Sequence, residues 1–209
     1  MRWFDRHFTF AWDRFTALQC VFTCCCVIAI PFGRPEWARD LGFLELIQMG
    51  IIVAGGIQAG LAGLDMSQSP VWRRFWNWSI WCWVLVLGRT VNWGRAFFDP
   101  SCPRIWFRLV CVVLVAGATV HFFAGGVYKT ALHLVARAPW PFWIILIGVA
   151  AYVVVDAAEH SRYGLVLART MRDIVEECLE MPVFAALFLM ARTIMGWTKT
   201  ASAMAVATV

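Results

Sequence analysis

The stretch GIIVAGGIQAGLAG, residues 50–63, has no charged side chain and lies in an apolar run over about 42–63. A transmembrane helix needs roughly 20 consecutive apolar residues, so this run is long enough to cross a bilayer. The stretch also places Gly56 and Gly60 four residues apart. Small residues at that spacing let two helices approach closely in lipid. The run therefore predicts a tightly packed membrane-spanning helix.

Five more apolar runs surround this one, and Pro and Gly punctuate nearly every joint between them. Of the 209 residues, 61% are hydrophobic and 15% are charged, whereas a soluble domain has about 45–50% apolar and about 25% charged residues. We expect residues 1–209 to form a single all-α domain, a polytopic transmembrane helix bundle with short loops and about six spans, with five as the alternative. The expected spans are 15–31, 42–63, 75–98, 105–128, 140–158 and 178–196.

The run LVLARTMRDIVEECLE, residues 165–180, is more polar than the six spans. It predicts either the first turns of a long sixth helix or, over 165–177, a separate amphipathic helix lying on the membrane surface.

The expected partners follow from the same patterns. The lipid bilayer is the first, and the face that carries Gly56, Gly60 and Gly63 serves either packing inside the bundle or a homodimer. No block of Lys and Arg is present, so nucleic-acid binding is not expected. Three arginines precede the first span and favour a cytoplasmic N-terminus.

Charged and amide side chains lie at the ends of four of these runs. Because neighbouring spans alternate in direction, all of these ends face the same leaflet. Ionisable residues within membrane spans are functional candidates because unpaired charges are costly in lipid. The candidate binding residues are Glu45, Gln48, Arg89, Asn92, Arg95, Asp156, Glu159, Glu176, Glu177 and Glu180.

Three interpretations of this cluster remain open: a structural ion-pair network, a polar pocket for an ion, lipid headgroup or small anion, and a metal site. Carboxylates and an imidazole could ligate a metal, and the residues concerned are Glu159, His160, Glu176 and Glu180. No tight metal motif is present, so we expect no metal and no cofactor. His121 has glycines four residues to either side, as in a haem site, but it lacks a second histidine at matching depth, and we expect it to bond to a neighbouring helix.

The segment Arg89-Thr-Val-Asn-Trp-Gly-Arg95 resembles the E-E-x-S-W-G-Q-type signature of small, uncharacterised bacterial polytopic membrane proteins. In those proteins a later helix also carries a run of glutamates, as in Glu176-Glu177-x-x-Glu180 here. The resemblance covers about twenty residues, and Arg89-Thr90 stand where the signature has two acids. It implies a bacterial origin and assigns no activity. The expected location of the protein is the bacterial inner membrane.

Three functions are compatible with this sequence. The first is a membrane protein that binds or transports a small solute, ion or lipid headgroup at the cluster. The second is a membrane-embedded enzyme acting on a lipid or lipid-linked phosphate, with no catalytic residue assigned. The third is a non-catalytic membrane subunit in which the charges only hold the bundle together.

Overall fold

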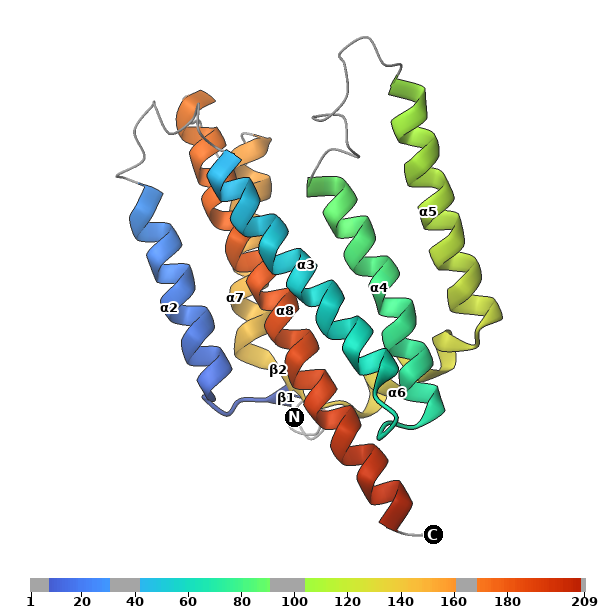
Figure 1. Ribbon diagram of the computed structural model, residues 1–209. Helices are drawn as coiled ribbons and strands as arrows, with labels where there is room; N and C mark the ends of the chain where they lie inside the picture. The colour runs from blue at the N-terminus through green and yellow to red at the C-terminus, as the bar shows by residue number, and fades with distance from the viewer. Residues whose placement is uncertain (1–7, 31–41, 91–103, 161–168, 208–209) are drawn as a thin grey trace. The chain divides into compact units, whose positions relative to one another are not determined.

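The structure, a computed structural model, describes residues 8–30, 42–90, 104–160 and 169–207. Most of these residues are helical, and the predicted all-α class is confirmed (Figure 1). One small addition is a parallel pair of two-residue strands, in which Phe8 pairs with Trp140. In chain order the elements are β1 (Phe8–Thr9), α2 (Arg14–Ala29), α3 (Gly42–Leu64), α4 (Pro70–Thr90), α5 (Arg104–Ala124), α6 (Val127–Arg137), β2 (Trp140–Pro141), α7 (Phe142–Glu159) and α8 (Arg169–Ala207).

The helices follow the six apolar runs, but the expectation of one helix over 105–128 is wrong at its C-terminal end. α5 ends at Ala124, and Gly126 has a φ of 67°. This left-handed conformation is readily adopted by glycine and stops the helix. α6 then begins at Val127 as a separate helix.

Two described helices are long and apolar enough to cross a bilayer, α3 over Leu44–Leu64 and α5 over Ile105–Ala124. Two further apolar helices are shorter, Arg14–Ala29 and Phe142–Ala158. Length and composition thus support two of the six expected spans, and the six-span bundle is not confirmed.

α8 is a single helix of 39 residues that contains Pro182, and it is about 58 Å long. Residues 169–177 are its first turns rather than a separate helix. Residues 165–168 of the predicted surface helix lie outside the described residues.

The chain divides into two compact units. Unit 1 contains Met1–Ile51 and Pro139–Thr193, and unit 2 contains Ile52–Ala138 and Ile194–Val209. α3 and α8 each contribute residues to both units.

The core of unit 1 lies between α2, α7 and α8. Ile144 of α7 is completely buried and packs with Ala186 and Leu189 of α8. A Cβ atom on Gly148 would lie 2.8 Å from the Cβ of Ala186, so glycine permits this close approach of α7 to α8. The buried Gln19 of α2 donates from Nε2 to the carbonyl of Pro182 at 2.8 Å and ties α2 to α8.

The core of unit 2 includes the small-residue face of α3, which packs on α4. A Cβ atom on Gly55 would lie 2.5 Å from the ring of Trp83, and one on Gly63 would overlap the side chain of Asn77. Gly60 faces Ile80 at a more ordinary distance of 3.8 Å. The small-residue face of α3 therefore packs against another helix of the same chain, which is one of its two expected roles. The homodimer through the same face stays a prediction.

The loop between α3 and α4 is bound to the C-terminal part of α8. Asp65 accepts a hydrogen bond from the Ser67 hydroxyl at 2.6 Å and an ion pair from Lys199 at 2.9 Å. Thr198 links the same elements, because it accepts from Trp76 Nε1 at 3.3 Å and donates to Gln68 Oε1 at 3.2 Å.

The carboxyl group of Asp65 should titrate unusually low. Ser67, through its hydroxyl, and then Lys199 hold the pKa of Asp65 at about 2, below the unfolded value of about 3.9. The stabilising effect is therefore complete above about pH 4 and is lost as the pH falls toward 2. We expect Ser67→Ala to raise the Asp65 pKa more than Lys199→Gln, as measured by NMR titration of the carboxyl carbon. The reverse order would assign the shift chiefly to the ion pair.

Candidate functional site

The best-defined polar contact of unit 1 joins the first turns of α3 to α8. Gln48 is 1% exposed, and its Nε2 donates to the Oε2 of Glu177 at 2.8 Å. The same nitrogen lies 3.1 Å from the backbone carbonyl of Glu177. The two residues were predicted to share one level of the membrane, and here they are in direct contact.

Further carboxylates surround this contact. Glu45, Glu176 and Glu180 all lie close enough to Glu177 for their charges to repel its own. The helix period explains the grouping, since residues three and four apart in α8 lie on one face. Glu45 lies one turn before Gln48 in α3 and is exposed. The acid that is bonded to Gln48 therefore has three other acids close to its charge.

The C-terminal end of α7 packs beside the same part of α8. Val155 and Ala158 of α7 form a buried cluster with Val175 and Leu179 of α8. This packing places the end of α7, including the predicted residue Asp156, along the acidic turns of α8.

Asp156 lies in the last turn of α7, and His160 directly follows this helix. The Nδ1 of His160 lies 3.4 Å from Asp156 Oδ1 and 3.2 Å from its carbonyl. Glu159 is in the last turn too, and its side chain is outside the described part. Among the described residues, no group of three or more His, Cys, Asp or Glu side chains is arranged to hold a metal ion.

The arginine part of the predicted cluster belongs to the other unit. Arg89 lies in the last turn of α4, in unit 2, and Asn92 and Arg95 lie outside the described residues. The predicted pairing of these arginines with glutamates of α8 stays a prediction.

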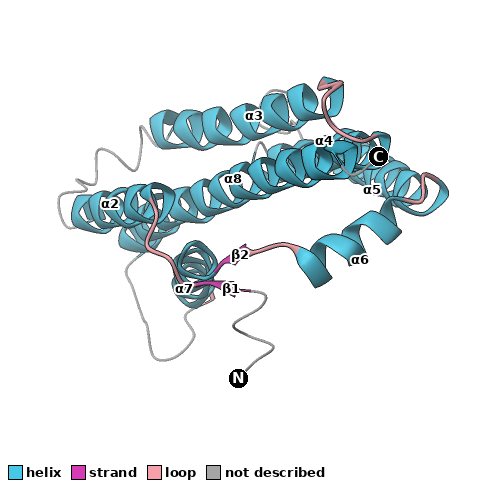
Figure 2. Cartoon of the chain, turned by 90° about the horizontal axis from the view of Figure 1, so that it is seen from below, coloured by secondary structure: helices cyan, strands magenta, loops and turns pink. Residues whose placement is uncertain are grey.

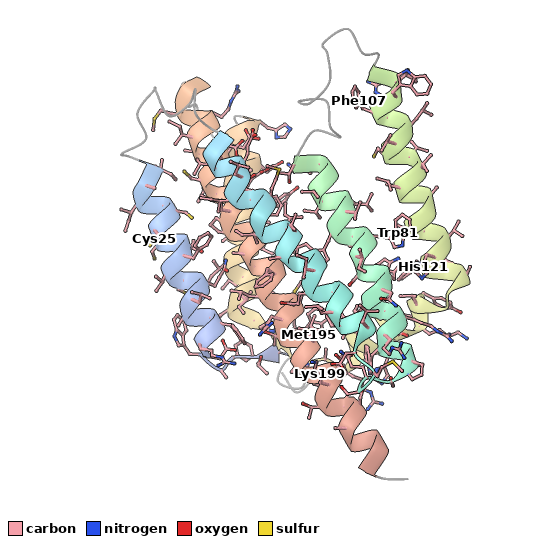
Figure 3. The ribbon with its side chains drawn as sticks, in the orientation of Figure 1. Cys25, Trp81, Phe107, His121, Met195 and Lys199 are labelled. Carbon is pink, nitrogen blue, oxygen red and sulfur yellow. The ribbon has the colours of Figure 1, made fainter. Side chains whose placement is uncertain are left out.

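Unit 2 has a polar contact that the sequence did not identify. Trp81 of α4 donates from Nε1 to His121 Nδ1 at 3.1 Å, and the two rings point toward each other (Figure 3). Trp78, one turn earlier, donates to the carbonyl of Ala118 at 3.0 Å. A Cβ atom on Gly117 would lie 3.4 Å from the Trp81 ring. The spacing of Trp78 and Trp81, one helical turn apart opposite Ala118 and His121, is the signal that could have revealed it.

The bond from Trp81 determines the tautomer of His121. Indole Nε1–H can only donate, so Nδ1 must be the acceptor, and the neutral ring carries its proton on Nε2. Nε2 is then an N–H donor and offers no lone pair to a haem iron. His121 is thus bonded to a neighbouring helix, as expected.

No known protein family matches this chain, and no curated protein or solved structure is similar to it. Function therefore has to be inferred from the chain's own geometry and chemistry.

Proposed function

We propose that this protein is a multi-pass protein of the bacterial inner membrane and that it binds a small organic cation at the contact between Gln48 and Glu177. The location is supported by α5. Only 6% of its apolar span Ile105–Ala124 is buried, whereas the core helix of a soluble protein would be mostly buried. Nine of its large apolar side chains are each at least 45% exposed, as lipid-facing side chains are: Ile105, Trp106, Leu109, Val110, Val112, Val113, Val115, Val120 and Phe123.

The ligand class follows from the charges at the site. Glu45, Glu176 and Glu180 lie close enough to Glu177 to repel its charge, and a carboxylate accepts charge-assisted hydrogen bonds from the N–H groups of an organic cation. A bound cation would place a positive charge beside Glu177 and offset this repulsion. Gln48 orients Glu177 through a 2.8 Å hydrogen bond.

Thermal denaturation of the detergent-purified protein tests this assignment. Ammonium, methylammonium and putrescine chlorides would be compared at constant ionic strength, with sodium chloride as the reference salt and sodium phosphate as the anion control. At ten times its Kd a ligand stabilises by about 1.4 kcal/mol, which raises the midpoint by roughly 3–6 °C. We expect one cation to give this shift in the wild type and none in Glu177→Gln.

Asp65→Asn is the matched control, because it removes a carboxylate from unit 2 and should retain the cation shift. A wild-type midpoint that no cation raises, together with early melting of Glu177→Gln, would make the cluster a structural network. A shift given by phosphate alone would instead indicate an anion site that uses the arginines.

A further inference from the structure

α6 is a short helix attached to the end of α5 within unit 2. It starts after the turn at Gly126, and in the view from below it is seen along its length beside the end of α5 (Figure 2). Val127, Thr130 and Leu134 are its buried residues. The ring of His133 also contacts Trp72 and Trp197 of the unit, with centroids 6.0 and 6.4 Å away, whereas Lys129, Leu132, Val135 and Arg137 are exposed.

The exposed surface of α6 has two stripes of different chemistry. Leu132 and Val135 are 65% and 59% exposed, and with Tyr128 they fall within about 60° of the helix circumference. Lys129 and Arg137 are exposed and lie within about 80° of each other. An apolar stripe next to a cationic stripe is the pattern of a helix that lies in a membrane interface.

The cations of α6 have few acids available within their own unit. The sequence of unit 2 contains nine Lys and Arg but only two acids, Asp65 and Asp99, and none occurs between Pro100 and Val155. Among the described residues of unit 2, Asp65 is the one acid, and Lys199 already pairs with it at 2.9 Å. A carboxylate that binds Lys129 or Arg137 without displacing Lys199 would therefore have to come from outside the described residues of this unit.

The position of α6 identifies the source of that charge. α6 begins where the apolar span of α5 ends, at Ala124, which is the level of the lipid headgroups if α5 crosses the bilayer. Aromatic rings concentrate at this level in membrane proteins, and Phe123 and Tyr128 lie here with ring centroids 6.1 Å apart. A nucleic acid would leave the apolar stripe of Leu132 and Val135 exposed to water. A phospholipid instead offers its phosphate to the cationic stripe and its acyl chains to the apolar stripe.

We propose that α6 lies in the headgroup layer of the bilayer and that Lys129 and Arg137 bind the phosphate groups of anionic phospholipids, while Leu132 and Val135 enter the acyl boundary. This inference rests on the proposed membrane location of α5, but it concerns a surface separate from the Gln48–Glu177 site.

Phosphatidylglycerol and phosphatidylcholine with identical chains provide the test. Each would be titrated into the purified full-length protein in neutral detergent, with the melting midpoint and the number of bound lipids by native mass spectrometry as readouts. Each cation contributes roughly fivefold to binding of an anionic lipid surface. We therefore expect Lys129→Gln/Arg137→Gln to need roughly 25-fold more phosphatidylglycerol for the half-maximal shift, with the phosphatidylcholine response unchanged. Lys129→Arg/Arg137→Lys, which keeps both positive charges of α6, should behave like the wild type.

Two results would overturn the inference, and they are distinguishable. An unchanged phosphatidylglycerol response in Lys129→Gln/Arg137→Gln would refute the α6 site alone and leave its surface to a protein partner. Failure of the wild type to bind either lipid would also refute the membrane location of α5.

Discussion

Replacing Gly55 by alanine should lower the free energy of unfolding by about 2–3 kcal/mol, the usual cost of overpacking a core. A Cβ atom there would lie 2.5–2.6 Å from three atoms of the Trp83 ring. Trp83 is only 9% exposed, so this rigid ring has little room to move. Denaturation of the purified protein in mixed micelles, followed by circular dichroism, measures the change.

Two other glycines of α3 provide the controls. Nothing lies within 4 Å of a Cβ atom on Gly50, so Gly50→Ala should be neutral or stabilise by about 0.5–1 kcal/mol. Gly63→Ala should lower the free energy of unfolding less than Gly55→Ala. A Cβ atom on Gly63 meets the end of the Asn77 side chain, which is exposed and can rotate away.

A double variant isolates the contact itself. Trp83→Leu removes the ring that Gly55→Ala would strike, so the second substitution should cost much less in that background. Equal costs of Gly55→Ala with and without Trp83 would show that the ring does not limit the space at this position.

The sequence predicted the helices because their apolar runs are long and are bounded by Pro and Gly. It predicted the small-residue face of α3 but not every glycine that packs tightly against α4. Gly63 lies on the predicted face, whereas Gly55 lies outside the pair of Gly56 and Gly60 and is tightly packed because the bulky ring of Trp83 falls opposite it. Spacing within one helix contains no information about the partner helix.

The division of the run 105–128 was missed for a related reason. The apolar pattern continues through Gly125-Gly126, and a hydropathy window does not detect the positive φ at Gly126. The paired glycines, followed by Lys129, were the available signal for a turn and a separate helix.

The acidic part of the candidate site was better predicted than the basic part. Alternating span direction predicted that Gln48 and Glu177 share one level, and the structure brings them into contact. The depth of a residue in the membrane does not predict which charged side chains face each other, because it leaves the rotation of each helix about its axis undetermined. The contact made by Gln48 therefore provides the most direct stability test of the site.

Replacing Gln48 by leucine should destabilise the protein by about 1–2 kcal/mol, because it removes the donor to a carboxyl acceptor. Glu177 would lose its 2.8 Å hydrogen bond while Glu45, Glu176 and Glu180 continue to repel its charge. Glu177→Gln should have the opposite outcome. Its amide oxygen still accepts from Gln48 and one negative charge is removed, so stability should be unchanged or higher.

The double variant Gln48→Leu/Glu177→Leu separates the hydrogen bond from simple packing. Replacing both partners by apolar side chains is often nearly neutral, so it should recover most of the stability lost in Gln48→Leu. Unfolding in mixed micelles gives all three free energies. If Gln48→Leu has no effect on stability and Glu177→Gln lowers it, the carboxylate charge itself stabilises the bundle. These acids would then form a structural network rather than a binding site.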